Sequence, residues 1–164
     1  MSELSFTPMT ADDFELFWPT FKAIVLEQHT YAIDPDINYQ AAYTLWCEVP
    51  RTTFAVKDSA GELVGSYYLK ANAAGPGDHV CNCGYMVTSA ARGKGVARAM
   101  CEHSQEIAQM AGFEAMQFNA VVSTNEVAVA LWQRLGFSIV GTVPKAYRHA
   151  SLGRVDTHVM HKIL

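Results

Sequence analysis

The sequence is poor in charge, and its charges form no basic block. Charged residues make up 17% of the 164 residues, and 12 basic side chains stand against 16 acidic ones, for a net charge of −4. Binding along the phosphates of a nucleic acid needs clustered lysines and arginines, so this class of protein is excluded. The longest fully apolar run covers only residues 127–132, whereas a membrane span needs ~18 apolar residues. The first five residues lack the basic and apolar regions of a signal peptide, so we expect a cytoplasmic protein with no membrane partner.

Cysteine and histidine motifs that hold metals are also missing. None of the four cysteines forms a CxxC pair, and the six histidines form neither HExxH nor HxxxH. Cys81 and Cys83 would lie on one face of a strand, which is poor geometry for a mutual disulfide. Cys47 and Cys101 lie in apolar sequence surroundings. The sequence therefore predicts free thiols and no metal site.

Hydrophobic residues, in contrast, make up half of the chain, enough for one sizeable core. We expect a single domain over residues 1–164. An N-cap at Thr10 precedes apolar residues at helical spacing as far as Val25, which predicts the first helix. The order of these elements predicts an α/β fold, with a mixed sheet and a central crossover unit. Its further helices cover Tyr39–Cys47, Val96–Met110 and Asn125–Leu135, and its strands cover Thr52–Lys57, Leu63–Leu69, Val80–Val87, Phe113–Val122, Ser138–Val143 and Thr157–Ile163.

The most informative segment joins the strand that ends at Val87 to the helix that begins at Val96. Two glycines, Gly93 and Gly95, permit backbone conformations in which several N–H groups point to one spot at the helix N-terminus. Arg92 and Lys94 add two positive charges, and the combination suits a pyrophosphate. Lys94 is followed by glycine rather than by serine or threonine, which excludes a Walker A loop, and the dinucleotide pattern GxGxxG is also absent.

The remaining pattern, R-x-x-G-x-A from Arg92 to Ala97, resembles the acetyl-CoA motif of the GNAT family of N-acetyltransferases. Two further features follow in the family's order. Asn125 opens a helix that continues as ALWQRLGF from residue 130, similar to the family's N…A-L-Y-x-x-x-G-F. The segment Gly141–Pro144, with Tyr147, also resembles a GNAT C-terminus. The similarity spans nearly all of the chain.

The resemblance implies a GNAT-type mixed, mostly antiparallel sheet, with splayed central strands and helices on both faces. It implies acetyl-CoA as the co-substrate and no metal. The backbone of Met86 and Val87 would pair with the pantetheine arm, and one of those N–H groups would polarise the thioester carbonyl. Asn125 would bind the arm near the thioester, where Trp132 replaces a tyrosine that often protonates the leaving thiolate. The pyrophosphate would be held by Arg92, Gly93, Lys94, Gly95, Val96 and Ala97.

A closer resemblance concerns the acceptor. The motif from Asp78 to Tyr85, together with Asn119 and Asn125, resembles the yeast acetyltransferases that act on azetidine-2-carboxylate and other proline analogues. It implies that Asn82 holds the substrate carboxylate, that Asn119 and Asn125 line the reaction site, and that Asn125 assists catalysis. Tyr85 would contact the substrate as well. The residues themselves also allow structural roles: Asn82 and Asn119 as hydrogen-bonding partners within the fold, and Asn125 as a helix cap.

The expected function is direct transfer of acetyl from acetyl-CoA to the amine of a small molecule, such as an amino or imino acid. Acceptors such as a polyamine or a protein N-terminus stay open, as does a non-catalytic acyl-CoA-binding sensor. The C-terminal strands could also form a homodimer. An ammonium acceptor must lose a proton before it attacks, and the candidate bases are Asp78, His79, Tyr85, Glu27 and Tyr147.

Overall fold

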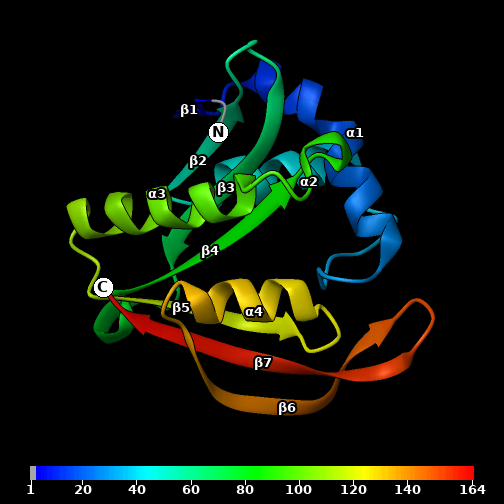
Figure 1. The fold of residues 1–164 in the computed structure, drawn as a ribbon, viewed down its shortest axis with the longest axis vertical. Coiled ribbons are helices and arrows are strands. Elements are labelled where there is room, and N and C mark those ends of the chain that lie inside the picture. Colours follow the sequence, from blue (N-terminus) through cyan, green and yellow to red (C-terminus); the bar gives the residue numbers. More distant parts are fainter. Residues whose placement is uncertain (1–2) are drawn as a thin grey trace.

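The computed structural model describes residues 3–164, which form one seven-stranded sheet in the order β1-β2-β3-β4-β5-β7-β6. Every neighbouring pair is antiparallel except β4 and β5, which are parallel. The fold is therefore the mixed, mostly antiparallel one that was predicted (Figure 1). The strands are β1 (Ser5–Pro8), β2 (Thr52–Lys57), β3 (Leu63–Ala71), β4 (Val80–Val87), β5 (Ala115–Val122), β6 (Ser138–His149) and β7 (Gly153–Ile163).

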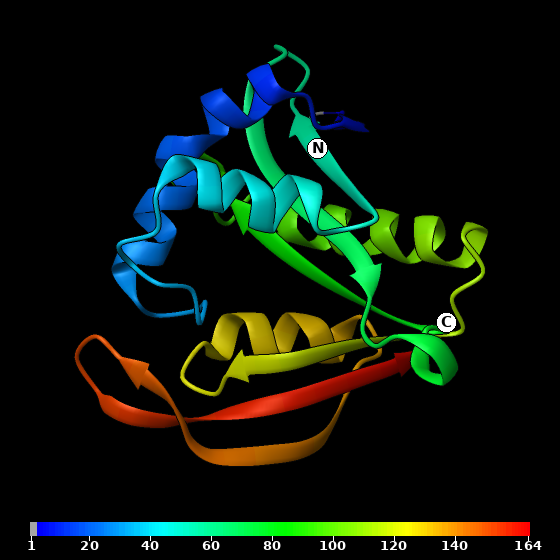
Figure 2. The same cartoon turned by 180° about the vertical axis from the view of Figure 1, so that it is seen from behind.

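Helices cover both faces of the sheet. One face carries α1 (Ala11–Glu27), α2 (Tyr39–Tyr43) and a π-helical turn over Thr44–Glu48, and the opposite face carries α3 (Val96–Met110) and α4 (Glu126–Arg134). Figure 1 shows α3 and α4 in front of the sheet, and Figure 2 shows α2 in front of it when the molecule is seen from behind. Each side has its own hydrophobic core, because a strand points alternate side chains to opposite faces.

The predicted strands over 52–57 and 80–87 and the helix over 96–110 are confirmed residue by residue. Sequence reasoning missed β1, a four-residue edge strand with mostly exposed side chains and no apolar alternation. It also ended β6 at Val143, whereas β6 continues to His149 and β7 begins at Gly153. The register between the two strands shifts between Val143 and Tyr147, and this irregularity interrupts the two-residue pattern.

The central feature of the sheet is the divergence of β4 and β5. Their register contains only two pairs, Val80 with Ala115 and Cys81 with Met116, although each strand is eight residues long. Beyond Cys81 the strands separate, while each keeps its other neighbour, and both figures show them spreading apart. The predicted splay of the central strands is thereby confirmed, and it leaves one backbone edge of β4 without a strand partner.

The start of α1 makes a testable prediction about stability. Thr10 and Asp13 form a capping box, and Lys57 Nζ lies 2.8 Å from Asp13 Oδ1. Burial raises the pKa of Asp13, but the hydrogen bonds from Lys57 and Thr10 outweigh it and leave that pKa lowered. The stabilisation is therefore present above the ordinary carboxyl pKa and is lost as the pH falls through the lowered one.

Asp13→Asn keeps an acceptor for the cap but removes the charge, so it should cost about 1 kcal/mol at pH 7. Urea unfolding of both proteins at pH 7 and near pH 3 measures this difference in unfolding free energy. We expect the two proteins to converge at acidic pH. An equal difference at both values would show that the charge of Asp13 does not stabilise the fold.

Candidate active site

The segment between β4 and α3 forms an open nest of N–H groups. Gly93 and Gly95 both have positive φ, +75° and +81°, and Gly95 occupies the N-cap position of α3 with no side-chain cap. The hydrogen bond from Ala99 N to Gly95 O is the one that begins the helix ladder. The N–H groups of Val96 and Ala97 precede that bond and are free to bind an anion at the positive end of the helix dipole.

Residues 92–95 are exposed, so this nest opens to solvent. A Cβ placed on Gly93 would meet nothing within 4 Å, so the positive φ rather than crowding explains this glycine. Arg92 lies 3.6 Å from Glu27 at the end of α1, and both side chains are exposed. Val96 is buried and can offer only its backbone N–H. Residues 92–97 therefore combine free N–H groups with two exposed positive side chains, which are the groups that suit a pyrophosphate.

The backbone of β4 faces its two neighbours alternately. Val80 O accepts from Asn72 N, and Thr88 N donates to Val64 O, so the even-numbered residues between them bond to β3. The N–H and C=O groups of the odd-numbered residues Cys83, Tyr85 and Val87 consequently face the gap toward β5. The predicted backbone contact at Met86 is wrong, because Met86 pairs with Ser66 on β3, and the gap-facing groups flank it.

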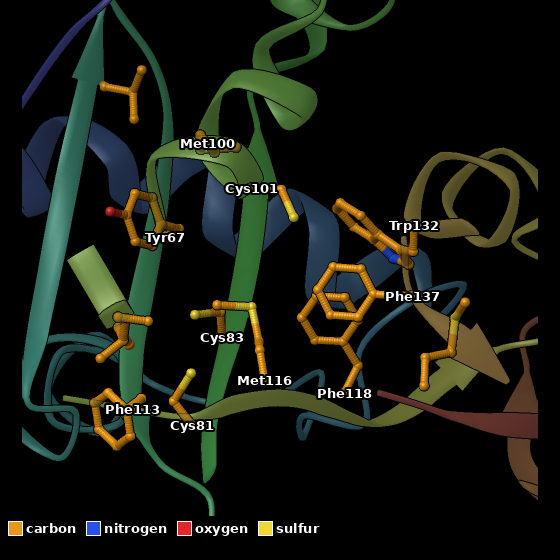
Figure 3. Close-up of a cluster of buried hydrophobic side chains, with 14 of the residues drawn as sticks. Tyr67, Cys81, Cys83, Met100, Cys101, Phe113, Met116, Phe118, Trp132 and Phe137 are labelled. Atoms are coloured by element: carbon orange, nitrogen blue, oxygen red, sulfur yellow. The ribbon is translucent and has the colours of Figure 1, made fainter. Parts of the chain in front are cut away.

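Tyr85 presents its side chain to the α3 side of the sheet. Its hydroxyl lies 2.8 Å from Ser104 Oγ, and its ring lies 5.2 Å from Trp132 and 5.9 Å from Phe118. Figure 3 shows Trp132 beside Phe118 and Phe137 in this core. Alternation puts the Tyr85 and Asn82 side chains on opposite faces of the sheet, so the structure does not bring these two predicted substrate contacts together. The backbone N–H and C=O of Tyr85 face the gap.

Asn82 lies on the α1–α2 side, as alternation predicted, and is 6% exposed. Its Oδ1 accepts from the Tyr68 hydroxyl at 3.0 Å, and its Nδ2 donates to Gln117 O at 2.9 Å. The side chain thus joins β4 to β5 one residue beyond the point where their register ends. Gly84 makes room for this arrangement, because a Cβ there would lie 2.5 Å from the Tyr68 ring. One N–H of the Asn82 amide is left for a ligand.

Asn119 is exposed at the point where the register of β5 with β7 shifts. It donates to Asn72 Oδ1 at 2.7 Å and accepts from Gln117 Nε2 at 3.0 Å. Lys70 pairs directly across from Asn82 on β3, and its Nζ lies 5.4 Å from the Tyr68 ring centroid. Within residues 3–164, no carboxylate lies within ion-pair distance of Lys70. Sequence analysis missed this lysine, since strand register alone brings it beside Asn82.

Asn125 is the N-cap of α4, and its Oδ1 accepts from Ala128 N at 3.4 Å. The cap uses the carbonyl oxygen, so the amide nitrogen can donate elsewhere. Trp132 follows two turns later and is 8% exposed, packed against Tyr85 and Phe118. Tyr85 and Phe118 come from the two diverging strands, so Trp132 contacts both of them.

The candidate bases are spread widely. Asp78 and His79 precede β4 and line a separate cavity of about 380 Å³ with Arg51 and Phe113, at the end where β4 and β5 are still paired. They are therefore excluded from the open end of the gap. Glu27 lies 3.6 Å from Arg92, in the loop that precedes α3.

The predicted base Tyr147 lies instead against the segment between α1 and α2. Its hydroxyl donates to Tyr31 O at 3.1 Å. The structure adds Tyr31 itself, whose hydroxyl donates to Tyr85 O at 2.6 Å. No sequence motif marks Tyr31, which lies between α1 and α2 and reaches β4 only through the tertiary fold.

The described part of the chain contains neither a metal-binding cluster nor a membrane-spanning helix. Among residues 3–164, no group of three or more histidine, cysteine, aspartate or glutamate side chains could hold a metal ion. None of the helices in this range combines the length and apolar character needed to cross a bilayer.

Comparison with known proteins identifies the family. Residues 14–137 match the acetyltransferase (GNAT) family. The chain belongs to the GNAT family. A GCN5-related N-acetyltransferase from Kribbella flavida is 43% identical, with a TM-score of 0.93 over 98% of both chains.

Two other relatives extend this comparison. N-acetyltransferase aca1 of Schizosaccharomyces pombe is 33% identical over an alignment that covers 67% of this chain. The chain spans only 53% of that relative's length. A GNAT phosphinothricin acetyltransferase from Sinorhizobium meliloti, solved with acetyl-CoA, is 20% identical. The superposition covers all of this chain and 89% of that one, and its TM-score of 0.84 shows a shared fold.

Proposed function

We propose that the protein is an acetyl-CoA-dependent N-acetyltransferase that acts on a small-molecule amine, with an amino or imino acid as the preferred acceptor. One observation carries this proposal: the open edge of β4 leads directly into the N–H nest at the start of α3. A ligand with a pyrophosphate and an amide-bearing arm has a partner for each part there. Membership of the GNAT family supports the same assignment.

In this proposal the two gap-facing residues near the end of β4 bind the pantetheine arm. Val87 would pair with its amides like an added strand. The Tyr85 N–H would donate to the thioester oxygen and stabilise the negative charge that develops there during attack. Residues 92–97 would hold the pyrophosphate, and the free amide nitrogen of Asn125 would donate to the arm near the thioester.

The acceptor would approach from the α1–α2 side, where Asn82, Asn119 and Lys70 lie. The remaining N–H of Asn82 and the ammonium of Lys70 suit a carboxylate, since a charged partner strengthens such a hydrogen bond. A polyamine would instead meet an unpaired positive charge at this place. The acceptor nitrogen must be neutral to attack, and with a pKa near ~10.4 only about one molecule in 10³ is neutral at pH 7.

Transfer would be direct, without an acetylated cysteine. Cys81 and Cys83 are buried in the core on the α3 side of β4. Burial raises the pKa of Cys83 well above its ordinary value, so that this thiol stays protonated at neutral pH. The hydrogen bond with Cys83 lowers the pKa of Cys81, but Cys81 is fully buried where β4 and β5 are still paired, which keeps substrates away from it. A thiol without a thiolate fraction is a poor nucleophile. The amine would therefore attack the thioester while both substrates are bound.

A panel of amines tests the function. Purified protein is incubated with acetyl-CoA and azetidine-2-carboxylate, hydroxyprolines, common amino acids, polyamines or an N-terminal peptide, and released thiol is measured. We expect turnover with the amino or imino acids. Turnover confined to polyamines or the peptide would overturn the acceptor class, and acetyl-CoA binding with no turnover on any amine would favour a sensor.

The variant Lys70→Met tests the carboxylate site separately. It should raise KM for the carboxylate-bearing acceptor by about 10-fold, equal to about 1.4 kcal/mol of lost binding. KM for acetyl-CoA should stay nearly unchanged, because Lys70 lies across from Asn82 near the start of β4, whereas the nest follows the end of that strand. The matched control is the acceptor without its carboxylate, azetidine itself, whose KM should not respond to the variant. Equal responses of both acceptors would show that Lys70 does not contact the carboxylate.

A further inference from the structure

Tyr31 brings a hydroxyl to the open edge of β4. Its oxygen lies 2.6 Å from the carbonyl oxygen of Tyr85, and this residue's N–H and C=O face the same gap. The backbone groups of β4 that face the gap belong to Cys83, Tyr85 and Val87. Within residues 3–164, no other side chain donates a hydrogen bond to them. The hydroxyl therefore lies beside the N–H that we assign to the thioester oxygen.

Contacts from two other parts of the chain hold Tyr31 in place. The Tyr147 hydroxyl donates to Tyr31 O at 3.1 Å, and Ala150 N, just past the end of β6, donates to Gln28 O at 3.1 Å. The Trp46 ring lies edge-on to the Tyr31 ring, with centroids 6.2 Å apart. Burial raises the pKa of the Tyr31 hydroxyl well above its ordinary range, so it keeps its proton at neutral pH. The fold thus supplies a fixed, protonated hydroxyl.

A proton donor at the departing sulfur would speed the reaction, and the other nearby side chains do not provide one. Trp132 has an indole N–H, which can donate a hydrogen bond but is not an acid at this pH. The Tyr85 hydroxyl is on the α3 side, bonded to Ser104. The Tyr67 hydroxyl is bonded to His103, and that of Tyr68 to Asn82.

We propose, on the basis of the function proposed above, that Tyr31 is a catalytic residue that relays a proton from the acceptor nitrogen to the sulfur of coenzyme A. The bond between carbon and nitrogen forms and the bond between carbon and sulfur breaks. One proton passes from the nitrogen to the Tyr31 oxygen, and the proton of Tyr31 passes to the departing sulfur. Tyr31 ends as the phenol that it was, so no further reagent is consumed. Rotation about the Cζ–Oη bond redirects its proton without moving the ring.

Steady-state kinetics of Tyr31→Phe with acetyl-CoA and azetidine-2-carboxylate, or with the amine that the panel selects, test this role. The ring is retained, so we expect KM and the calorimetric Kd for acetyl-CoA to change by less than about threefold. Loss of a positioned acid and base should lower kcat by about 10²-fold. The rate of the variant should rise with the concentration of imidazole buffer at fixed pH and ionic strength, because a small acid can replace the hydroxyl.

Tyr67→Phe is the matched control, since it also removes one buried tyrosine hydrogen bond, that to His103 at 2.7 Å, but on the α3 side. It should keep kcat near the wild-type value and show no dependence on buffer concentration. A kcat of Tyr31→Phe within about threefold of wild type would overturn the proposal. So would a loss of kcat that imidazole does not restore and that is matched by weaker acetyl-CoA binding. Absence of turnover in the wild-type protein would instead refute the proposed function itself.

Discussion

Replacing Gly95 with glutamate is expected to weaken acetyl-CoA binding by more than about 100-fold, or about 2.7 kcal/mol. Gly95 has a φ of +81° at the N-cap of α3, a conformation that costs a residue with a side chain about 1–2 kcal/mol. The new carboxylate would also lie in the nest of N–H groups that we assign to the pyrophosphate, and would repel it. Isothermal titration calorimetry with acetyl-CoA measures the loss.

Gly61→Glu is the matched control for this variant. Gly61 has the same φ of +81°, lies in the exposed turn between β2 and β3, and has open space where a Cβ would be. It therefore bears the same backbone strain and the same added charge, but outside the residues 92–97 that we assign to the pyrophosphate. We expect acetyl-CoA to bind Gly61→Glu as it binds the wild type. Unchanged affinity in Gly95→Glu would refute the phosphate assignment.

Replacing Phe118 with alanine is expected to destabilise the protein by about 3–5 kcal/mol. Phe118 is 5% exposed, and its ring stacks on Phe137 with centroids 4.4 Å apart and lies 5.3 Å from Trp132. The backbone pairing of β4 with β5 ends at Met116, before Phe118. These aromatic contacts therefore hold α4 against the diverging strands. Thermal unfolding should show a midpoint lower by roughly 10 °C.

The control at the same position is Phe118→Leu, which keeps most of the buried volume and should cost less than half as much. A fall in the midpoint that is equal for both variants would show that the volume beneath Trp132 does not matter. A change of less than about 3 °C for the alanine variant would contradict the account of this core.

The parts of the fold that sequence reasoning predicted well are those with local signals. β4 is bounded by a loop and a glycine-rich turn, and α3 has apolar residues at helical spacing, so their bounds were confirmed. β1 and the far half of β6 lack such signals, because both are edge strands with mostly exposed side chains. Their existence depends on pairing with β2 and β7, which a local pattern does not contain.

In the candidate site, too, the features with a local signal were predicted and those that depend on distant contacts were missed. Alternation along β4 placed Asn82 opposite Cys81 and Cys83, and the loop glycines indicated the nest of N–H groups. The choice of Met86 failed, because the direction of a backbone group depends on which strand lies on each side. Tyr31 and Lys70 were missed for the same reason, since each reaches the site only through contacts between distant segments of the chain.

A crystal structure of the protein with acetyl-CoA tests the central claim most directly. We expect the pantetheine arm between β4 and β5, bonded to the backbone of Tyr85 and Val87, with the pyrophosphate on residues 92–97. The Tyr31 hydroxyl should lie within reach of the thioester sulfur. Binding of the coenzyme elsewhere would contradict the account. One such place is the cavity of about 620 Å³ beside Arg98, Arg134 and Lys162, between α3 and the end of α4.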